Sequence, residues 1–126
     1  MRIEHIALWV ENFEKVRIFY ETYFDAQSNE KYENPSKRFE SYFLTFPDSS
    51  CRIELMHRPD LVKHTKEMIG YAHIAFSLGC KQAVDTLTER LRLDGYTHVD
   101  GPRTTGDGYF ESVCLDPEAN KIELTI

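Results

Sequence analysis

The sequence predicts an α+β fold in which two βαβββ modules form one curved, eight-stranded mixed sheet with the helices on its convex face. The first observation behind this prediction is an internal repeat. The tripeptide His-Ile-Ala occurs at 5–7 and 73–75, and Ile-Glu-Leu occurs at 53–55 and 122–124. The second is the spacing, because each half runs 49 or 50 residues from its histidine to its glutamate. One structural unit used twice explains both.

The first half reads as a strand, a helix and three further strands. Aliphatic and other side chains alternate over 3–10, which is typical of a strand with one buried face. Glu11-Asn12 provides a helix cap, and apolar residues then recur at spacings of three and four, which predicts an amphipathic helix over 13–24. Turn residues separate three further segments. The strands of this half are therefore expected at 3–10, 27–33, 40–46 and 51–57.

The second half repeats this order after a linker. A strand over 71–78 leads to a helix from about Lys81 to Asp94, which Gly95 ends. Further strands are expected near 96–99, 109–115 and 121–126, with Gly101-Pro102 and Asp116-Pro117 as turns. We expect a single domain over 1–126, consisting of a module at 1–57, a linker at 58–70 and a module at 71–126.

Strand alternation places four candidate metal ligands on the face opposite the main aliphatic side chains. They match in type and position across the repeat: His5, Glu54, His73 and Glu123. One such residue alone would read as an ordinary polar side chain on a solvated face, whereas four matched residues favour a site. Imidazole and carboxylate suit borderline metals better than calcium. We expect one divalent ion per site, nickel or zinc, with cobalt as a further option.

Charge and composition exclude some classes of partner. The chain has 126 residues and a net charge of −6, which argues against a nucleic-acid partner. No apolar run approaches the roughly 18 residues that span a bilayer, so we expect no membrane partner. We expect a cytoplasmic location. The three cysteines fit no zinc or redox spacing, and we expect all three to be small buried residues.

The pattern resembles the vicinal oxygen chelate superfamily, which contains the glyoxalases and the bleomycin resistance proteins. The resemblance covers the whole chain, including segments at 3–9, 19–24 and 72–75. It is most specific at 116–124, where the sequence DPEANKIEL is similar to the family's DPxGNxIEL ending. Two glycines common in the family are replaced, by Asp25 and by Ala119. Aspartate tolerates a left-handed conformation, and alanine does so less well.

The four-ligand set resembles that of glyoxalase I, the lactoylglutathione lyase. The resemblance implies a metal-dependent lyase or isomerase acting on a small α-carbonyl compound, or on its thiol adduct. Proton transfer would pass through a metal-stabilised enediolate, with Glu54 or Glu123 as the catalytic base. Which glutamate is the base stays open. The alternatives are another metal-dependent enzyme of the superfamily, such as an epimerase or a thiol transferase, and a binding protein of the bleomycin-resistance kind without turnover.

Four further side chains share a face with the ligands and are weaker candidates for substrate contact: Trp9, Arg52, Met56 and Tyr71. Arg52 could instead pair with a neighbouring acid. Trp9 and Arg58 stand where glyoxalases often have an arginine and an asparagine that hold glutathione, so weak turnover of the glutathione adduct is expected. The family is usually dimeric, and we expect a homodimer. Its subunits could share each site, an arrangement we favour, or each could hold its own.

Overall fold

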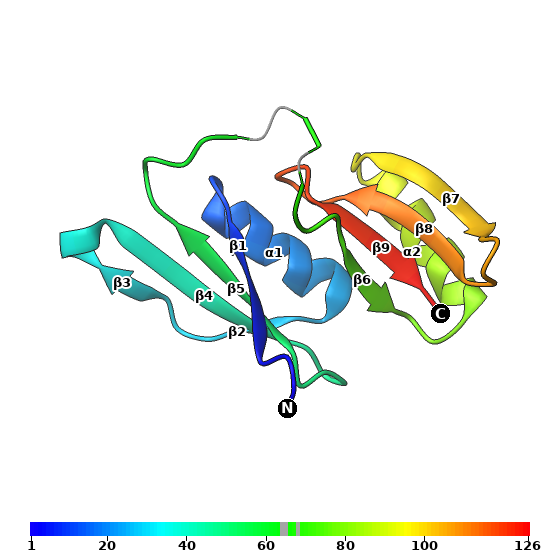
Figure 1. Ribbon diagram of the computed structural model, residues 1–126, viewed down its shortest axis with the longest axis horizontal. Coiled ribbons are helices and arrows are strands. Elements are labelled where there is room, and N and C mark those ends of the chain that lie inside the picture. The colour runs from blue at the N-terminus through cyan, green and yellow to red at the C-terminus, as the bar shows by residue number, and fades with distance from the viewer. Residues whose placement is uncertain (64–65, 68) are drawn as a thin grey trace. The chain divides into compact units, whose positions relative to one another are not determined.

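The computed structural model describes residues 1–63, 66–67 and 69–126, and the chain divides into two units, Met1–His64 and Thr65–Ile126. In its described part, each unit consists of one sheet and one α-helix (Figure 1). The predicted α+β class and the βαβββ order of both modules are confirmed. The union of the two sheets into one curved sheet stays a prediction, as do the boundaries of the linker at 58–70.

The first unit is a mixed sheet with strand order β1-β5-β4-β2, in which β3 also pairs with β4. Strand β1 runs parallel to β5, and the other pairs are antiparallel. A 3₁₀ turn, η1, lies between β3 and β4. The elements of this unit are β1 (His5–Trp9), α1 (Phe13–Phe24), β2 (Gln27–Ser28), β3 (Tyr32–Asn34), η1 (Pro35–Lys37), β4 (Phe39–Thr45) and β5 (Arg52–His57).

The expected strand at 27–33 is two strands, β2 and β3, which raises the total to nine in the described residues. Asn29 lies between them. Its backbone N–H donates to the Phe43 carbonyl at 3.1 Å, and its side-chain oxygen accepts from the Phe43 N–H at 2.7 Å. A side chain has thus replaced a backbone partner of β4, which interrupts the ladder between the two strands.

Helix α1 begins and ends as the sequence predicts. The Asn12 side chain accepts from the Lys15 N–H at the amino end, and Asp25 adopts a left-handed conformation with φ 52° at the other end. The face that packs on the sheet is fully or almost fully buried. Its buried residues are Phe13, Val16, Phe19, Tyr20 and Phe24.

The second unit is a sheet of strand order β6-β9-β8-β7, with β6 parallel to β9 and the other pairs antiparallel. Strand β6 begins one residue after His73, so that histidine precedes the strand. The elements of this unit are β6 (Ile74–Ser77), α2 (Lys81–Leu93), β7 (His98–Thr104), β8 (Phe110–Leu115) and β9 (Lys121–Thr125). The described part of the chain contains no helix long and apolar enough to cross a membrane.

The expectation that Gly101-Pro102 forms a turn is wrong, because both residues lie inside β7. The pairing of β7 with β8 shifts register on either side of Asp100, and such a bulge accommodates a proline and a glycine within a strand. Gly101 has φ 81°, and a Cβ there would lie 2.5 Å from the Glu111 carbonyl oxygen. Only glycine therefore fits this position.

The prediction that all three cysteines are buried is confirmed for Cys114 and wrong for Cys80. Cys114 is fully buried in β8, Cys51 is half-buried, and Cys80 is exposed. Cys80 is the N-cap residue of α2, where its side chain makes no capping hydrogen bond. Its position at a helix end places it at the surface, which a composition argument about cysteines does not detect.

Burial of aliphatic residues sets which way the candidate glutamates point. Ile53 and Leu55 are at most 4% exposed, and Ile122 and Leu124 are fully buried. Glu54 and Glu123 alternate with them and therefore lie on the opposite face of their sheets. A slip of one residue in either strand would bury the glutamate and expose the aliphatic pair, so the core itself specifies this register.

Candidate metal centre

The first unit brings His5 and Glu54 together. His5 opens β1 and Glu54 lies in the parallel neighbour β5, where its paired residue is Ala7. The Nε2 atom of His5 is 3.8 Å from Oε2 of Glu54. The glutamate side chain is 16% exposed and the histidine side chain 39%, so the pair lies at the surface of this sheet face. The small side chain of Ala7 leaves the face open beside the pair.

The second unit repeats this arrangement with His73 and Glu123. Here the Nε2 atom of His73 is 3.4 Å from Oε2 of Glu123, with side-chain exposures of 44% and 17%. Glu123 lies in β9, and its parallel partner residue is Ala75. The alanine that follows each histidine by two residues is therefore paired with the glutamate in both units. The sequence repeat is thus a repeat of side-chain geometry.

Each pair has the donor chemistry and the separation of two ligands of one metal ion. A nitrogen and an oxygen each about 2.1 Å from one ion lie about 3.0 Å apart at a right angle and about 3.4 Å apart at a tetrahedral angle. The observed separations of 3.4 and 3.8 Å need little or no closure to reach these values. Among residues 1–63, 66–67 and 69–126, no three His, Cys, Asp or Glu side chains are grouped as a metal site. Within each unit, the described residues thus place one histidine and one glutamate together.

A network around His5 orients its ring. The Nδ1 atom of His5 lies 2.5 Å from Oε2 of Glu4, and the other Glu4 oxygen is 2.5 Å from an Arg52 nitrogen. The edge of Phe43 meets the His5 ring at 5.4 Å between centroids, and the Arg52 guanidinium stacks 4.0 Å from the Phe43 centroid. The hydrogen bond with His5 and the ion pair with Arg52 hold the pKa of the Glu4 carboxyl below its ordinary value.

In this network, Arg52 is the ion-pair partner of an acidic residue. Its guanidinium pairs with the acid Glu4, which was one of the two roles the sequence suggested. Sequence reasoning missed Glu4 and Phe43. The predicted strand at 3–10 contained Glu4, but β1 begins only at His5, so alternation gave no guide to the Glu4 side chain. Phe43 lies next to Glu54 because β4 pairs with β5, and this pairing was not predicted. The adjacency of an acid and a histidine was the one available signal.

The second unit has a different set of neighbours. Ala72 stands where Glu4 stands in the first unit, and Val113 pairs with Glu123 where Phe43 pairs with Glu54. An arginine of β7 lies near Glu123 instead. Its hydrogen bond to Asp100 raises the pKa of the Arg103 guanidinium, and the charges of Glu111 and Glu123 raise it further. The two halves therefore hold equivalent histidine–glutamate pairs in unequal surroundings.

The other predicted substrate contacts lie either on the face of Glu54 or before the strands of the second unit. Trp9 and Met56 are paired residues of β1 and β5, on the same face as Glu54, and Trp9 is 45% exposed. Tyr71 precedes β6 and is 98% exposed.

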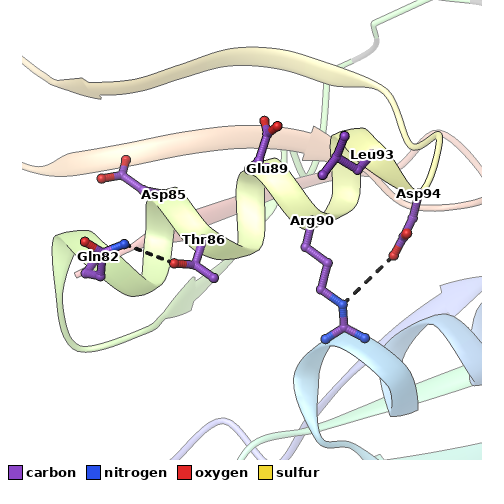
Figure 2. Close-up of a pocket in the computed structure, with 7 residues that line it drawn as sticks. All are labelled: Gln82, Asp85, Thr86, Glu89, Arg90, Leu93 and Asp94. Atoms are coloured by element: carbon purple, nitrogen blue, oxygen red, sulfur yellow. Dashed lines mark hydrogen bonds and ion pairs between the residues drawn. The ribbon is translucent and has the colours of Figure 1, made fainter.

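The structure adds one contact that the sequence did not predict. Arg58 places its guanidinium 4.8 Å from the centroid of the Trp9 ring. A hollow on the outer face of α2 contains none of the predicted site residues (Figure 2).

Known proteins resemble this chain in sequence or in fold. A protein of Bacillus subtilis (strain 168), the uncharacterised YqjT, is 26% identical, and the match covers 97% of this chain and 96% of that protein. A glyoxylase/bleomycin resistance protein/dioxygenase domain from Frankia has a TM-score of 0.85 at 16% identity, covering 100% of this chain and 97% of that one. The trypanothione-dependent glyoxalase I of Leishmania major has a TM-score of 0.79 at 20% identity, covering 99% and 86%.

These structural likenesses show a shared fold. The sequence itself decides the family, because the family model matches almost the whole chain, at residues 2–124. On that match, the chain belongs to the Glyoxalase/Bleomycin resistance protein/Dioxygenase superfamily.

Proposed function

We propose that this protein is a metal-dependent lyase or isomerase of the glyoxalase I kind, acting on a small α-carbonyl compound or on its thiol adduct. The observation that carries the proposal is the repeated histidine–glutamate pair, with Nε2–Oε2 separations of 3.8 Å and 3.4 Å. Two matched pairs supply four donors of the two types that borderline divalent metals prefer. A protein that only binds an organic ligand does not require such a set.

His5, Glu54, His73 and Glu123 would together hold one nickel, zinc or cobalt ion. When bound, a divalent ion stabilises negative charge that develops on substrate oxygens. The two imidazoles would bind as neutral donors through Nε2. For His5, the Glu4 carboxylate on Nδ1 favours the required tautomer, because it keeps the proton on Nδ1.

One of the two glutamates would serve as the base that transfers the proton. Both Glu54 and Glu123 are mostly covered but retain 16–17% exposure, so a carboxylate oxygen remains accessible to substrate. One of them would take the proton from the carbon next to the carbonyl and return it to the neighbouring carbon. The two glutamates have unequal surroundings, so their roles in the reaction can differ.

The thiol carrier need not be glutathione. One structural neighbour is a glyoxalase I that is trypanothione-dependent, so enzymes of this fold differ in the thiol they use. An epimerase or thiol transferase would share the metal and differ in the substrate. A bleomycin-resistance-type binding protein would share the fold without turnover.

Metal analysis of the purified protein tests the proposal. The Glu54→Ala and Glu123→Ala variants should each lose most of the nickel, zinc or cobalt that the unaltered protein carries. Glu33→Ala is the matched control, since Glu33 pairs with Lys31 away from the ligands. Unchanged stoichiometry in both variants would remove the ligand assignment.

Turnover then separates the remaining functions. The substrates to compare are the hemithioacetals that methylglyoxal forms with glutathione and with simple thiols. Turnover that is lost in Glu54→Ala or Glu123→Ala supports the lyase or isomerase. Metal without turnover of any hemithioacetal points to another enzyme of the superfamily, and absence of both points to the binding protein.

A further inference from the structure

The face of the first sheet that carries His5 and Glu54 continues into a row of larger side chains. Trp9 pairs with Met56, Met56 with Ser41, and Ser41 with Tyr32, so four adjacent strands contribute one side chain each. Paired residues of neighbouring strands point to the same face. The Trp9 row, as this set is called below, consists of Trp9, Met56, Ser41 and Tyr32.

The two ends of the row are exposed aromatic side chains, whereas Ser41 between them is buried. Trp9 is 45% exposed and Tyr32 is 53% exposed. Phe39 joins the two, because its ring meets Trp9 edge-on at 6.2 Å and lies 6.2 Å from Tyr32. Aromatic side chains that are held by neighbouring rings and remain half-exposed are suited to bind a flat or apolar group.

A cation lies at the end of this row. The Arg58 guanidinium stacks 4.8 Å from the Trp9 centroid, and its Nε atom pairs with Asp60 at 3.1 Å. A guanidinium has five N–H donors, so one contact at Nε leaves the terminal nitrogens to bind an acceptor. The Asp60 carboxylate is 70% exposed, and an exposed ion pair of this kind holds its partner weakly.

We propose that Arg58, stacked on Trp9, receives the carboxylate of the substrate, and that Trp9 and Met56 contact the apolar part between this carboxylate and the carbonyl. This inference rests on the proposed function and specifies its substrate class. Trp9 follows His5 by four residues, which is roughly 13 Å along the strand. The substrate is then an α-carbonyl compound, or its thiol adduct, that carries a carboxylate on the order of 10 Å from the carbonyl.

The single tryptophan of the chain allows a direct test, since its fluorescence reports on Trp9 alone. The probes are 6-phenylhexanoate and its neutral analogue 6-phenylhexanol, titrated into the full-length protein as purified and again after dialysis against EDTA. We expect the anion to bind about tenfold more tightly than the alcohol, as one charge-assisted hydrogen bond permits. Arg58→Gln should abolish this preference, and Asp60→Asn should increase it by removing a competing carboxylate.

Arg17→Gln is the matched control. Arg17 also stacks on a ring, 5.4 Å from the Tyr42 centroid, but it belongs to α1 and to the helix-covered side of the sheet. It should keep the preference of the unaltered protein. If Arg58→Gln keeps the preference too, Arg58 only braces Trp9 and the proposal is wrong. Absence of binding by both probes at millimolar concentration would equally overturn it.

Failure of this inference is distinct from failure of the proposed function. The titration after EDTA dialysis does not depend on a bound metal. Arg58→Gln should retain the metal content of the unaltered protein, because Arg58 lies outside the two histidine–glutamate pairs. Normal metal content with no anion preference would reject the substrate class alone, whereas lost metal in the glutamate variants concerns only the metal site.

Discussion

Glu4 and His5 are neighbours in sequence and partners in the structure, with a carboxylate oxygen of Glu4 2.5 Å from Nδ1 of His5. The other ring nitrogen, Nε2, faces Glu54. A carboxylate on one nitrogen of an imidazole fixes the tautomer and the orientation of the other. Ala72 occupies the equivalent position before His73 and cannot do this. The first histidine–glutamate pair is therefore oriented by a carboxylate at a position where the second pair has an alanine.

The Glu4→Gln variant should bind zinc about 10- to 100-fold more weakly than the unaltered protein. The amide is a poorer acceptor for the Nδ1 proton and also loses the charge that pairs with Arg52. Competition against a chelator of known affinity measures the effect, and Glu33→Gln serves as the control. An unchanged zinc affinity would mean that the contact between Glu4 and His5 is incidental.

Replacing Ala119 with glycine should stabilise the protein by about 0.5–1 kcal/mol. Ala119 has φ 66° in the turn between β8 and β9, where Asp116 accepts from the backbone of Glu118 and Asn120. An alanine side chain is strained in this left-handed conformation, and glycine is not. Denaturant unfolding measures the change in the free energy of unfolding.

Ala83→Gly in helix α2 is the opposing control and should lower stability by about 0.5–1 kcal/mol, because glycine is unfavourable inside a helix. Asp25→Gly, at φ 52°, should gain less than Ala119→Gly, since aspartate tolerates this conformation better. A loss of stability in Ala119→Gly would show that the turn is not strained at this residue.

Side-chain periodicity predicted most of the fold and the faces of the two candidate glutamates. Alternation around Ile53 and Leu55 correctly turned Glu54 away from the core. The sequence repeat correctly indicated two equivalent modules, and the two expected left-handed positions, Asp25 and Ala119, are confirmed by their positive φ.

Features that depend on partners distant in the sequence were not predictable in this way. Gly101-Pro102 reads locally as a turn, and only its pairing with β8 keeps it within a strand. Asn29 divides an expected strand because its side chain meets Phe43 of another strand. Arg58 reads as part of a linker, and its contact with Trp9 depends on the parallel pairing of β1 with β5.

The three cysteines should differ strongly in their reaction with iodoacetamide. Cys80 is exposed and should react first. Burial covers Cys114 and raises the pKa of its thiol, so this residue should stay unlabelled in the native protein. Mass spectrometry of the labelled peptides measures both rates.

Denaturant should expose Cys114 and make it react as fast as Cys80, which serves as the control for this comparison. Because its pKa is raised in the folded state, Cys114 also opposes folding once the pH exceeds the pKa of the unfolded thiol. Rapid labelling of Cys114 in the native protein would show that β8 is not covered as the structure describes.

The glutathione–methylglyoxal adduct should be a poor substrate, with kcat/KM below about 10⁴ M⁻¹s⁻¹. Trp9 and Arg58 stand where glyoxalases often hold glutathione, and the exposed Trp9 ring suits an apolar group better than the polar peptide of glutathione. Turnover of this adduct by nickel- or zinc-loaded protein, compared with adducts of simple thiols, measures the preference. A value at or above that limit would show that glutathione is accepted despite the two replacements.

The last prediction concerns which subunits supply the two histidine–glutamate pairs. We propose a homodimer in which His5 and Glu54 of one subunit act with His73 and Glu123 of the other. Mixing a His5→Ala variant with a Glu123→Ala variant should then restore metal binding. In each mixed dimer both lesions fall in one site and the other site is intact. Since about half of randomly paired dimers are mixed, roughly a quarter of all sites should recover.

The opposite outcome is expected if each chain holds its own site. Every site then keeps one lesion, and mixing the variants restores no metal binding. Sedimentation analysis gives the prior check, because a monomeric protein that binds metal at full stoichiometry would exclude the shared site.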